Sequence, residues 1–339
     1  MTGSPIVTLT PAPTLDRTYF VHNLQEGGVN RAEGVGEELA GKGINVSRGL
    51  HLAGFKAPGV VPIGNADPGV LDRTGSTDFL IPFWVEGTLR VSTTIVEHEG
   101  PTTKVNEAPR PLSEEDWRGV IELTINTVDE NKAKWLVIAG ALPVYKSTGT
   151  YVDLEPLFTA MKERGVRVAL DTSGEPLNYW ARRGLASIIK PNAEELASAV
   201  GRTLTTVGDV VDAARQLCEH GIECVLASLG ADGMIAVTRN DQWAARTPPV
   251  KVINTVGAGD ATMAGFLSAV GNDTVAGDEN SPGFDVAKGV GAAVQWGAIA
   301  VTQPSSGLEN LDNMPTSMVS NAPDRAAHLE EPAVFHPNH

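Results

Sequence analysis

The sequence predicts an α/β fold in which helices cover both faces of a mainly parallel sheet. Short β-branched runs alternate with segments that have the apolar spacing of amphipathic helices. The 339 residues, 42% of them hydrophobic, are enough for one large core. We expect strands at 6–10, 59–63, 135–139, 166–171, 187–190 and 223–228, and helices at 43–53, 114–129, 153–164, 192–200 and 207–219. Ligands of such folds collect at the carboxyl ends of the strands.

Two segments interrupt this alternation, at about residues 17–40 and 86–107. They contain strand-like pieces with no helix between them. We expect a small antiparallel sheet that projects from the main sheet as a lid; the alternative is a surface hairpin with no role in binding. Residues 1–310 then form a single domain. Residues 311–339 form a polar C-terminal tail, with little regular structure from about residue 318.

The composition limits the class of function. Lys and Arg number 26 against 41 Asp and Glu, and the net charge of −15 argues against binding nucleic acid or an anionic membrane. Two cysteines, no basic leader segment and no apolar run of membrane-spanning length predict a cytoplasmic protein. An anionic ligand would need local cations to attract it.

The strongest motif is Gly257-Ala258-Gly259-Asp260, which precedes a small-residue segment with helical spacing. The glycines let the backbone approach a ligand closely, and the first helical turn leaves N–H groups free to bind an anion. Asp260 either favours the helix dipole or caps the helix, or it accepts a hydroxyl proton while the amides stabilise a transferring phosphoryl group. The combination favours phosphoryl transfer.

Two further motifs follow expected strands. Asn192 and Glu195 have the spacing of a capping box, which predicts a well-started helix. Alternatively, Glu195 faces the strand ends and holds a water of hydrated Mg²⁺. The stretch from Ser228 to Gly233 is either a hairpin turn or a loop along which an adenine nucleotide lies.

The stretch from Gly36 to Gly43 has the glycine and lysine spacing of a P-loop. It lacks the Ser or Thr that a P-loop needs after its lysine, and two glutamates would repel a triphosphate. It offers instead a Gly41-Lys42-Gly43 turn and the amide of Asn45 one helical turn later. These groups suit the hydroxyls and phosphate of a sugar, and we expect the glycines to leave room for that substrate.

With these motifs, residues 6–307 resemble the PfkB, or ribokinase-like, family of carbohydrate kinases. Residues 40–48, Ala-Gly-Lys-Gly-Ile-Asn-Val-Ser-Arg, are similar to its first signature, and residues 254–261, Asn-Thr-Val-Gly-Ala-Gly-Asp-Ala, to its second. The likeness is greatest to bacterial 1-phosphofructokinases and tagatose-6-phosphate kinases. Three departures are Thr10 in place of Asn, two extra residues before Asp16, and Ala141 in place of Ser.

The resemblance implies a three-layer α/β/α sandwich whose β-lid closes over a sugar, with ATP and Mg²⁺ as cofactors. It implies that Asp260 is the catalytic base, that Gly257, Ala258 and Gly259 form an anion hole, and that Glu195 assists Mg²⁺. The implied ATP contacts are Lys190, Asn192, Ser228, Gly230, Gly233 and Thr255. The implied sugar contacts are Asp16, Gly41, Lys42 and Asn45, with Arg90, Arg31 and Lys104 for the phosphate of the substrate.

The implied reaction is phosphorylation of fructose 1-phosphate to fructose 1,6-bisphosphate. The alternatives are a kinase for tagatose 6-phosphate or an unphosphorylated sugar, and a catalytically idle sensor that binds sugar and nucleotide. Lid strands with open edges would pair across a homodimer.

Overall fold

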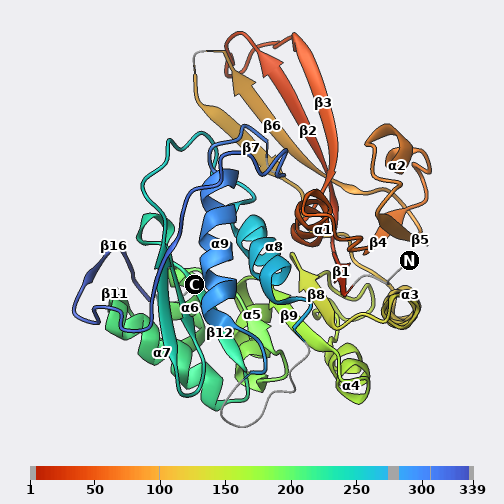
Figure 1. Ribbon diagram of the computed structural model, residues 1–339. Coiled ribbons are helices and arrows are strands. Elements are labelled where there is room, and N and C mark those ends of the chain that lie inside the picture. Colours follow the sequence, from red (N-terminus) through yellow and green to blue (C-terminus); the bar gives the residue numbers. More distant parts are fainter. Residues whose placement is uncertain (1–4, 99, 274–281, 306, 336–339) are drawn as a thin grey trace.

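The computed structural model describes residues 5–98, 100–273, 282–305 and 307–335, and its centre is a ten-stranded sheet (Figure 1). The strands from β12 to β5 pair in parallel, whereas β13, β14 and β15 continue the sheet antiparallel. In spatial order they are β15 (Met318–Ser320), β14 (Gln242–Arg246), β13 (Met234–Val237), β12 (Cys224–Ser228), β10 (Ile188–Ile189), β9 (Arg167–Asp171), β8 (Trp135–Ala139), β1 (Ile6–Leu9), β4 (Gly59–Gly64) and β5 (Leu80–Val85).

Helices cover both faces of this sheet, so the molecule has the expected three layers. One face is packed by α3 (Glu114–Asn131), α4 (Glu155–Glu163), α5 (Gly174–Arg183), α6 (Ala193–Val200) and α7 (Val207–Glu219). The other is packed by α1 (Lys42–Leu52), α8 (Ala258–Val270) and α9 (Val286–Ala300). Alternate residues of a strand serve the two cores: Leu136 of β8 lies in the first, Val137 in the second.

The lid is a separate four-stranded sheet that projects from the body (Figure 1). Its order is β3 (Gly34–Ala40), β2 (Thr14–Val21), β6 (Arg90–Glu97) and β7 (Thr102–Asn106). The antiparallel expectation holds for the two outer pairings, whereas the central pairing of β2 with β6 is parallel. That parallel pairing is possible because β2 and β6 are far apart in the chain and each enters the lid from the main sheet.

The C-terminal segment carries more regular structure than we expected. β15 pairs with β14 at the edge of the main sheet, and β16 (His328–Ala333) pairs with β11 (Leu204–Thr206). The expectation of little regular structure from about residue 318 is therefore wrong. The segment is mostly polar, so its sequence did not indicate that two of its side chains, Leu329 and Ala333, are buried against the body. Residues 336–339 of the expected tail lie outside the described residues.

Each expected strand and helix is present, with ends shifted by a few residues. α5, α9 and the short α2 (Val70–Arg73) were not expected. α9 is buried on most sides, so its apolar residues show little of the one-sided spacing by which helices are recognised. Among the described residues, no helix combines the length and the apolarity needed to cross a bilayer.

Candidate active site

The site lies where the parallel strands of the main sheet end. From β1 the chain builds β4 and β5 on one side and β8, β9, β10 and β12 on the other, so the crevice beside β1 is a topological switch point. The backbone N–H of Gly140, just after β8, donates to the carbonyl of Asp171 at the end of β9, at 2.9 Å. The strand ends therefore meet at one edge, where four charged side chains gather.

A buried carboxylate, Asp171, lies between two lysines. The Nζ atom of Lys42 is 2.8 Å from one of its oxygens, and Nζ of Lys190 is 3.1 Å from the other. Burial by itself raises the pKa of Asp171, but the charges of Lys190 and Lys42 outweigh burial and hold that pKa below its usual value. Asp171 was not among the expected contacts. Its signal in the sequence was an acidic residue at the end of an apolar strand.

Asp260 lies in the first turn of α8 beside this group. It is buried, and one of its oxygens accepts a hydrogen bond from Nδ2 of Asn45 at 2.8 Å, across 215 residues of sequence. Burial, followed by the charge of Asp171, raises the pKa of Asp260 to about 6. Asp260 does not cap α8, because the N-cap is Gly257 in the left-handed conformation. Of the alternatives for Asp260, the capping one is therefore excluded.

The glycine turn at the start of α8 lets other groups come close to its backbone. A Cβ atom on Gly259 would lie 3.1 Å from Nζ of Lys190, so the glycine lets the ammonium group come next to the helix start. The first-turn N–H groups of a helix have no intrahelical partner and favour an anion. Thr255 is exposed in the loop just before this turn. The amides, the helix dipole and Lys190 together have the charge and the hydrogen-bond donors that suit a phosphate group.

Glycine is needed on both sides of Lys42 for a different reason from the one we expected. A Cβ atom on Gly43 would lie 2.4 Å from Oγ1 of Thr10 and 2.9 Å from the carbonyl oxygen of Leu9. A Cβ on Gly41 would lie 2.6 Å from Cγ2 of Thr10. The space beside these glycines is thus filled by the end of β1 and does not provide room for a substrate. Gly41 offers a ligand only its backbone.

The capping box at the start of α6 is confirmed. The side chain of Asn192 accepts the N–H of Glu195 at 2.8 Å, and Oε2 of Glu195 accepts the N–H of Asn192 at 2.9 Å. Burial by itself lowers the pKa of Lys42, but Asp171 outweighs burial and raises that pKa, and Glu195 is near enough for its charge to add to the rise. The other carboxylate oxygen of Glu195 has no hydrogen-bond partner among the residues that the structure describes, and such an oxygen suits Mg²⁺ or its water.

The stretch after β12 is a hairpin, as one of its two interpretations predicted. It contains the 3-10 turn η1 (Gly230–Asp232), and the N–H of Leu229 donates to the carbonyl of Gly233 at 2.9 Å. Gly233 has a φ of 89°, and a Cβ there would lie 2.2 Å from the carbonyl oxygen of Ala245. Ser228 is joined to Asn192 by an isolated parallel bridge, so both loops lie on the same side of the site.

Comparison with known proteins identifies the family of this chain. A profile of the pfkB family of carbohydrate kinases matches residues 12–313. The 1-phosphofructokinase of Haloferax volcanii is 34% identical over 273 residues, which are 78% of this chain and 83% of the relative. The 1-phosphofructokinase of Bacillus subtilis is 32% identical over 268 residues, 78% and 85% of the two chains. Phosphofructokinase-2 from Escherichia coli, solved in complex with potassium, has a TM-score of 0.76 at 29% identity, covering 91% and 96%.

The chain belongs to the pfkB family of carbohydrate kinases. It is therefore a phosphotransferase that uses an alcohol group as acceptor, and its fold is the ribokinase-like sandwich of that family.

The lid of this pfkB kinase brings together two of the expected sugar contacts, Asp16 and Arg90. Burial and the charge of Glu38 raise the pKa of Asp16 to about 6, and Arg90 and Lys104 are near enough to lower it. One oxygen of Asp16 is buried without a hydrogen-bond partner among the described residues. Arg31 does not join this group, because it is exposed in the loop between β2 and β3.

Arg90 also has a structural task that the sequence did not reveal. Its guanidinium donates to the carbonyls of Ala12 at 2.9 Å, Glu107 at 3.1 Å and Pro13 at 3.3 Å. These carbonyls belong to the segments that enter and leave the lid. Arg90 therefore holds the lid base together, and two of its five N–H groups have no partner in the described part of the chain and remain for a ligand.

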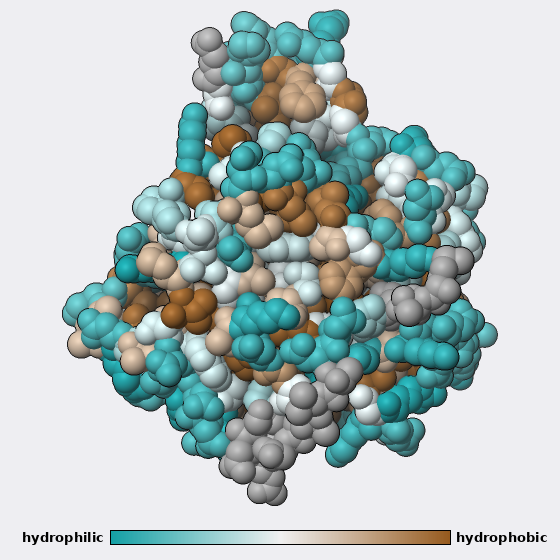
Figure 2. Space-filling view, in the orientation of Figure 1, coloured by the Kyte–Doolittle hydropathy of each residue, from teal (hydrophilic) through white to brown (hydrophobic). Residues whose placement is uncertain are grey.

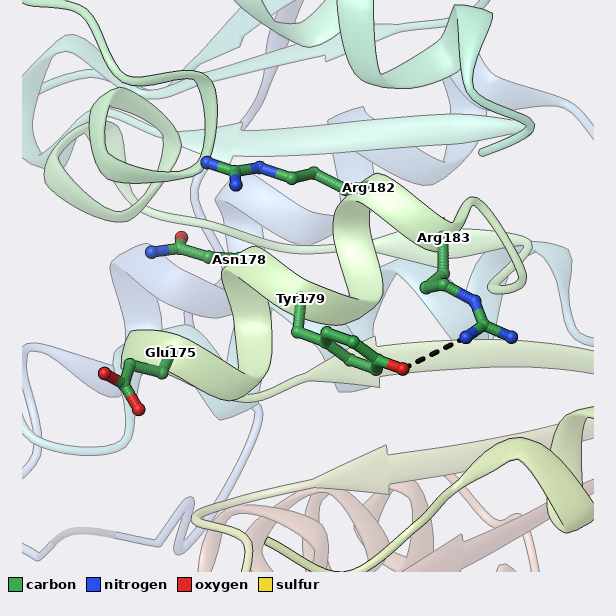
Figure 3. Close-up of a pocket in the computed structure, with 5 residues that line it drawn as sticks. All are labelled: Glu175, Asn178, Tyr179, Arg182 and Arg183. Carbon is green, nitrogen blue, oxygen red and sulfur yellow. Dashed lines mark hydrogen bonds between the residues drawn. The ribbon is translucent and has the colours of Figure 1, made fainter. Parts of the chain in front are cut away.

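A separate hollow of about 360 Å³ lies along α5 (Figure 3). Both of its arginines are engaged: Arg183 donates to the hydroxyl of Tyr179 at 3.0 Å, and Arg182 donates to the carbonyl of Ala199 at 3.3 Å. None of the side chains that line it belongs to the group around Asp260. They are Glu175, Asn178, Tyr179, Arg182 and Arg183.

Replacing Asp171 with Asn should destabilise the kinase, because it leaves two ammonium groups facing each other beside a buried site. We expect a loss of about 3 kcal/mol in the free energy of unfolding, measured by urea denaturation. Asp67→Asn is the matched control, since Asp67 forms an exposed ion pair with Arg73 and should cost about 0.5 kcal/mol. Equal losses in the two variants would contradict a special role for Asp171.

Proposed function

We propose that this kinase transfers the γ-phosphoryl group of ATP to fructose 1-phosphate at its free primary hydroxyl, giving fructose 1,6-bisphosphate. The observation that carries the proposal is the buried Asp260 beside the glycine turn of α8, with Lys42 and Lys190 across from it. The two curated relatives described above, both named 1-phosphofructokinase, support the choice of substrate.

Asp260 acts as the general base of this reaction. Asn45 donates to one of its oxygens, which fixes the carboxylate and leaves the other oxygen to accept the proton of the substrate hydroxyl. A carboxylate with a pKa of about 6 is ionised at neutral pH and is a stronger base than an ordinary aspartate. The repulsion from Asp171 is thus part of what makes Asp260 effective.

The nucleotide lies on the α8 side of the site. The amides of Gly257, Ala258 and Gly259, with Lys190, stabilise charge on the transferring phosphoryl group. Glu195 would hold a water of Mg²⁺, an ion that would supply neutralisation of phosphate charge when bound. The remaining contacts of ATP are Asn192, Ser228, Gly230, Gly233 and Thr255.

The sugar lies between the lid and α1. Its hydroxyls contact Asp16, the backbone of Gly41, and Asn45. Its phosphate meets Lys42, Lys104 and the free N–H groups of Arg90, whereas Arg31, exposed in the loop between β2 and β3, attracts the anion only from a longer range. These cations supply the local attraction that a chain of net charge −15 needs for an anionic substrate.

Asp260→Asn should lower kcat by about a thousand-fold, because the amide cannot accept the proton, while ATP binding by calorimetry stays close to wild type. In the wild-type kinase, kcat should fall as the pH drops below about 6, since protonation of Asp260 removes the base. Near-normal turnover of Asp260→Asn would contradict the assignment of Asp260 as the general base. A wild-type enzyme without turnover on any sugar, but with measurable ATP binding, would favour the sensor.

The substrate is tested with a coupled ADP-release assay on fructose 1-phosphate, tagatose 6-phosphate, fructose 6-phosphate and fructose. We expect the highest kcat/KM for fructose 1-phosphate. Lys104→Ala should raise the KM for the phosphorylated sugars about ten-fold and leave that for fructose unchanged, because the ligand contact that it removes is the one to the phosphate. Lys104 is a cleaner probe than Arg90, whose removal would also loosen the lid base. Highest kcat/KM for tagatose 6-phosphate or fructose would replace the proposed substrate.

We propose further that the lid mediates a homodimer. Its edge strands β3 and β7 carry exposed Val35 and Val105, and Figure 2 shows hydrophobic surface on the lid. The double variant Val35→Glu, Val105→Glu should shift sedimentation from dimer to monomer, because charge at the contact opposes association. Leu185→Glu, at an exposed leucine of the body, is the matched control. A wild-type chain that sediments as a monomer would contradict the dimer.

A further inference from the structure

The C-terminal strap, residues 318–335, lies beyond residue 313, where the family match ends. In Figure 1 it runs along the side of the body that carries α6 and α7. β15 adds to the edge of the main sheet and β16 pairs with β11. Between these strands, the N–H groups of Gly208 and Val207 donate to the carbonyls of Arg325 and Ala327, both at 2.9 Å.

The strap is attached by burial as well as by backbone bonds. Leu329 is 5% exposed and Ala333 is 1% exposed, and both belong to the core cluster that includes α6 and α7. Arg325 pairs with Asp212 at 2.7 Å, but both side chains are largely exposed, so this ion pair contributes little. The strap is therefore an integral part of the α6 and α7 side of the molecule.

β16 also contacts the hairpin that follows β12. The backbone N–H of Glu330 donates to Oδ2 of Asp232 at 2.8 Å. Asp232 ends η1, between Gly230 and Gly233, which are two of the proposed ATP contacts. The bond turns the Asp232 carboxylate toward the strap, so that its negative charge is held by an amide.

The strap supports the other end of the hairpin through β14. Val319 of β15 pairs with Ala245 of β14, and the carbonyl of Ala245 occupies the position that a Cβ on Gly233 would take. The hairpin is thus held at Asp232 by β16 and backed at Gly233 by the β14 and β15 pair. Both of its glycines have positive φ, a conformation that leaves the free chain many alternatives.

We propose that the C-terminal strap positions the nucleotide loop, residues 228–233, for ATP. This inference rests on the proposed function, because it takes that loop as the ATP contact. A loop held in its binding conformation binds more tightly, since less conformational entropy is lost on association. The coupling is reciprocal, so ATP must stabilise the strap by the same factor by which the strap favours ATP.

The test uses full-length variants that either remove or keep the hydrogen bond from the N–H of Glu330 to Asp232. Glu330→Pro removes the N–H that donates the bond, and Glu330→Ala keeps it, so the pair separates the backbone contact from the side chain. Asp232→Ala removes the acceptor and serves if the proline variant does not fold, which thermal unfolding reports. We expect Glu330→Pro and Asp232→Ala to raise the KM for ATP about five-fold or more. In these two variants the KM for the sugar phosphate should stay within about two-fold of wild type. In Glu330→Ala both KM values should stay within the same limit.

A second measurement reads the strap directly. Hydrogen exchange of residues 324–335 should slow when a non-hydrolysable ATP analogue binds the wild-type chain, and should change less in Asp232→Ala. A KM for ATP unchanged in the variants that lose the bond, or equal rises in KM for both substrates, would overturn the inference. If wild type binds ATP but its strap does not respond, the strap inference alone fails. If wild type does not bind ATP, the proposed function fails with it.

Discussion

The ion pairs of Asp171 with Lys42 and Lys190 are the interaction on which the rest of the site depends. Lys42 comes from the start of α1, beneath the lid, and Lys190 follows β10 on the side of the α8 turn. One buried carboxylate thus joins the two halves of the crevice. Because the three groups carry one net positive charge, they balance the ionised Asp260 next to them. A chain with strong overall negative charge can in this way present a locally cationic site to an anion.

The hydrogen bond from Asn45 to Asp260 joins the two signatures of the family, residues 40–48 and 254–261. α1 and α8 pack on the same face of the sheet, and this places the amide of the first signature against the carboxylate of the second. Neither helix is long, but both start at the edge where the strands end. The carboxylate is buried by that packing, and its burial is the largest cause of its raised pKa.

Features that depend on a few neighbouring residues could be predicted from the sequence. The capping box of Asn192 and Glu195, the hairpin after Ser228 and the glycine turn before α8 all formed where their residues indicated. Prediction was poorer where burial decides the outcome. α9 was missed because burial on most sides removes its periodicity, and β16 was missed because its polar residues flank only two buried ones.

The sequence by itself determined which functional groups the site contains: a glycine turn that starts a helix, a carboxylate in the first turn of that helix, and lysines at strand ends. These follow from local backbone preferences, which each segment carries with it. Only the tertiary structure decided the partners. It placed Asp171 between two lysines, gave Arg90 the carbonyls of the lid base, filled the space beside Gly43 with Thr10, and laid the strap against Asp232. Each of these contacts joins residues far apart in the chain, so strand order and helix packing, rather than sequence spacing, bring them together.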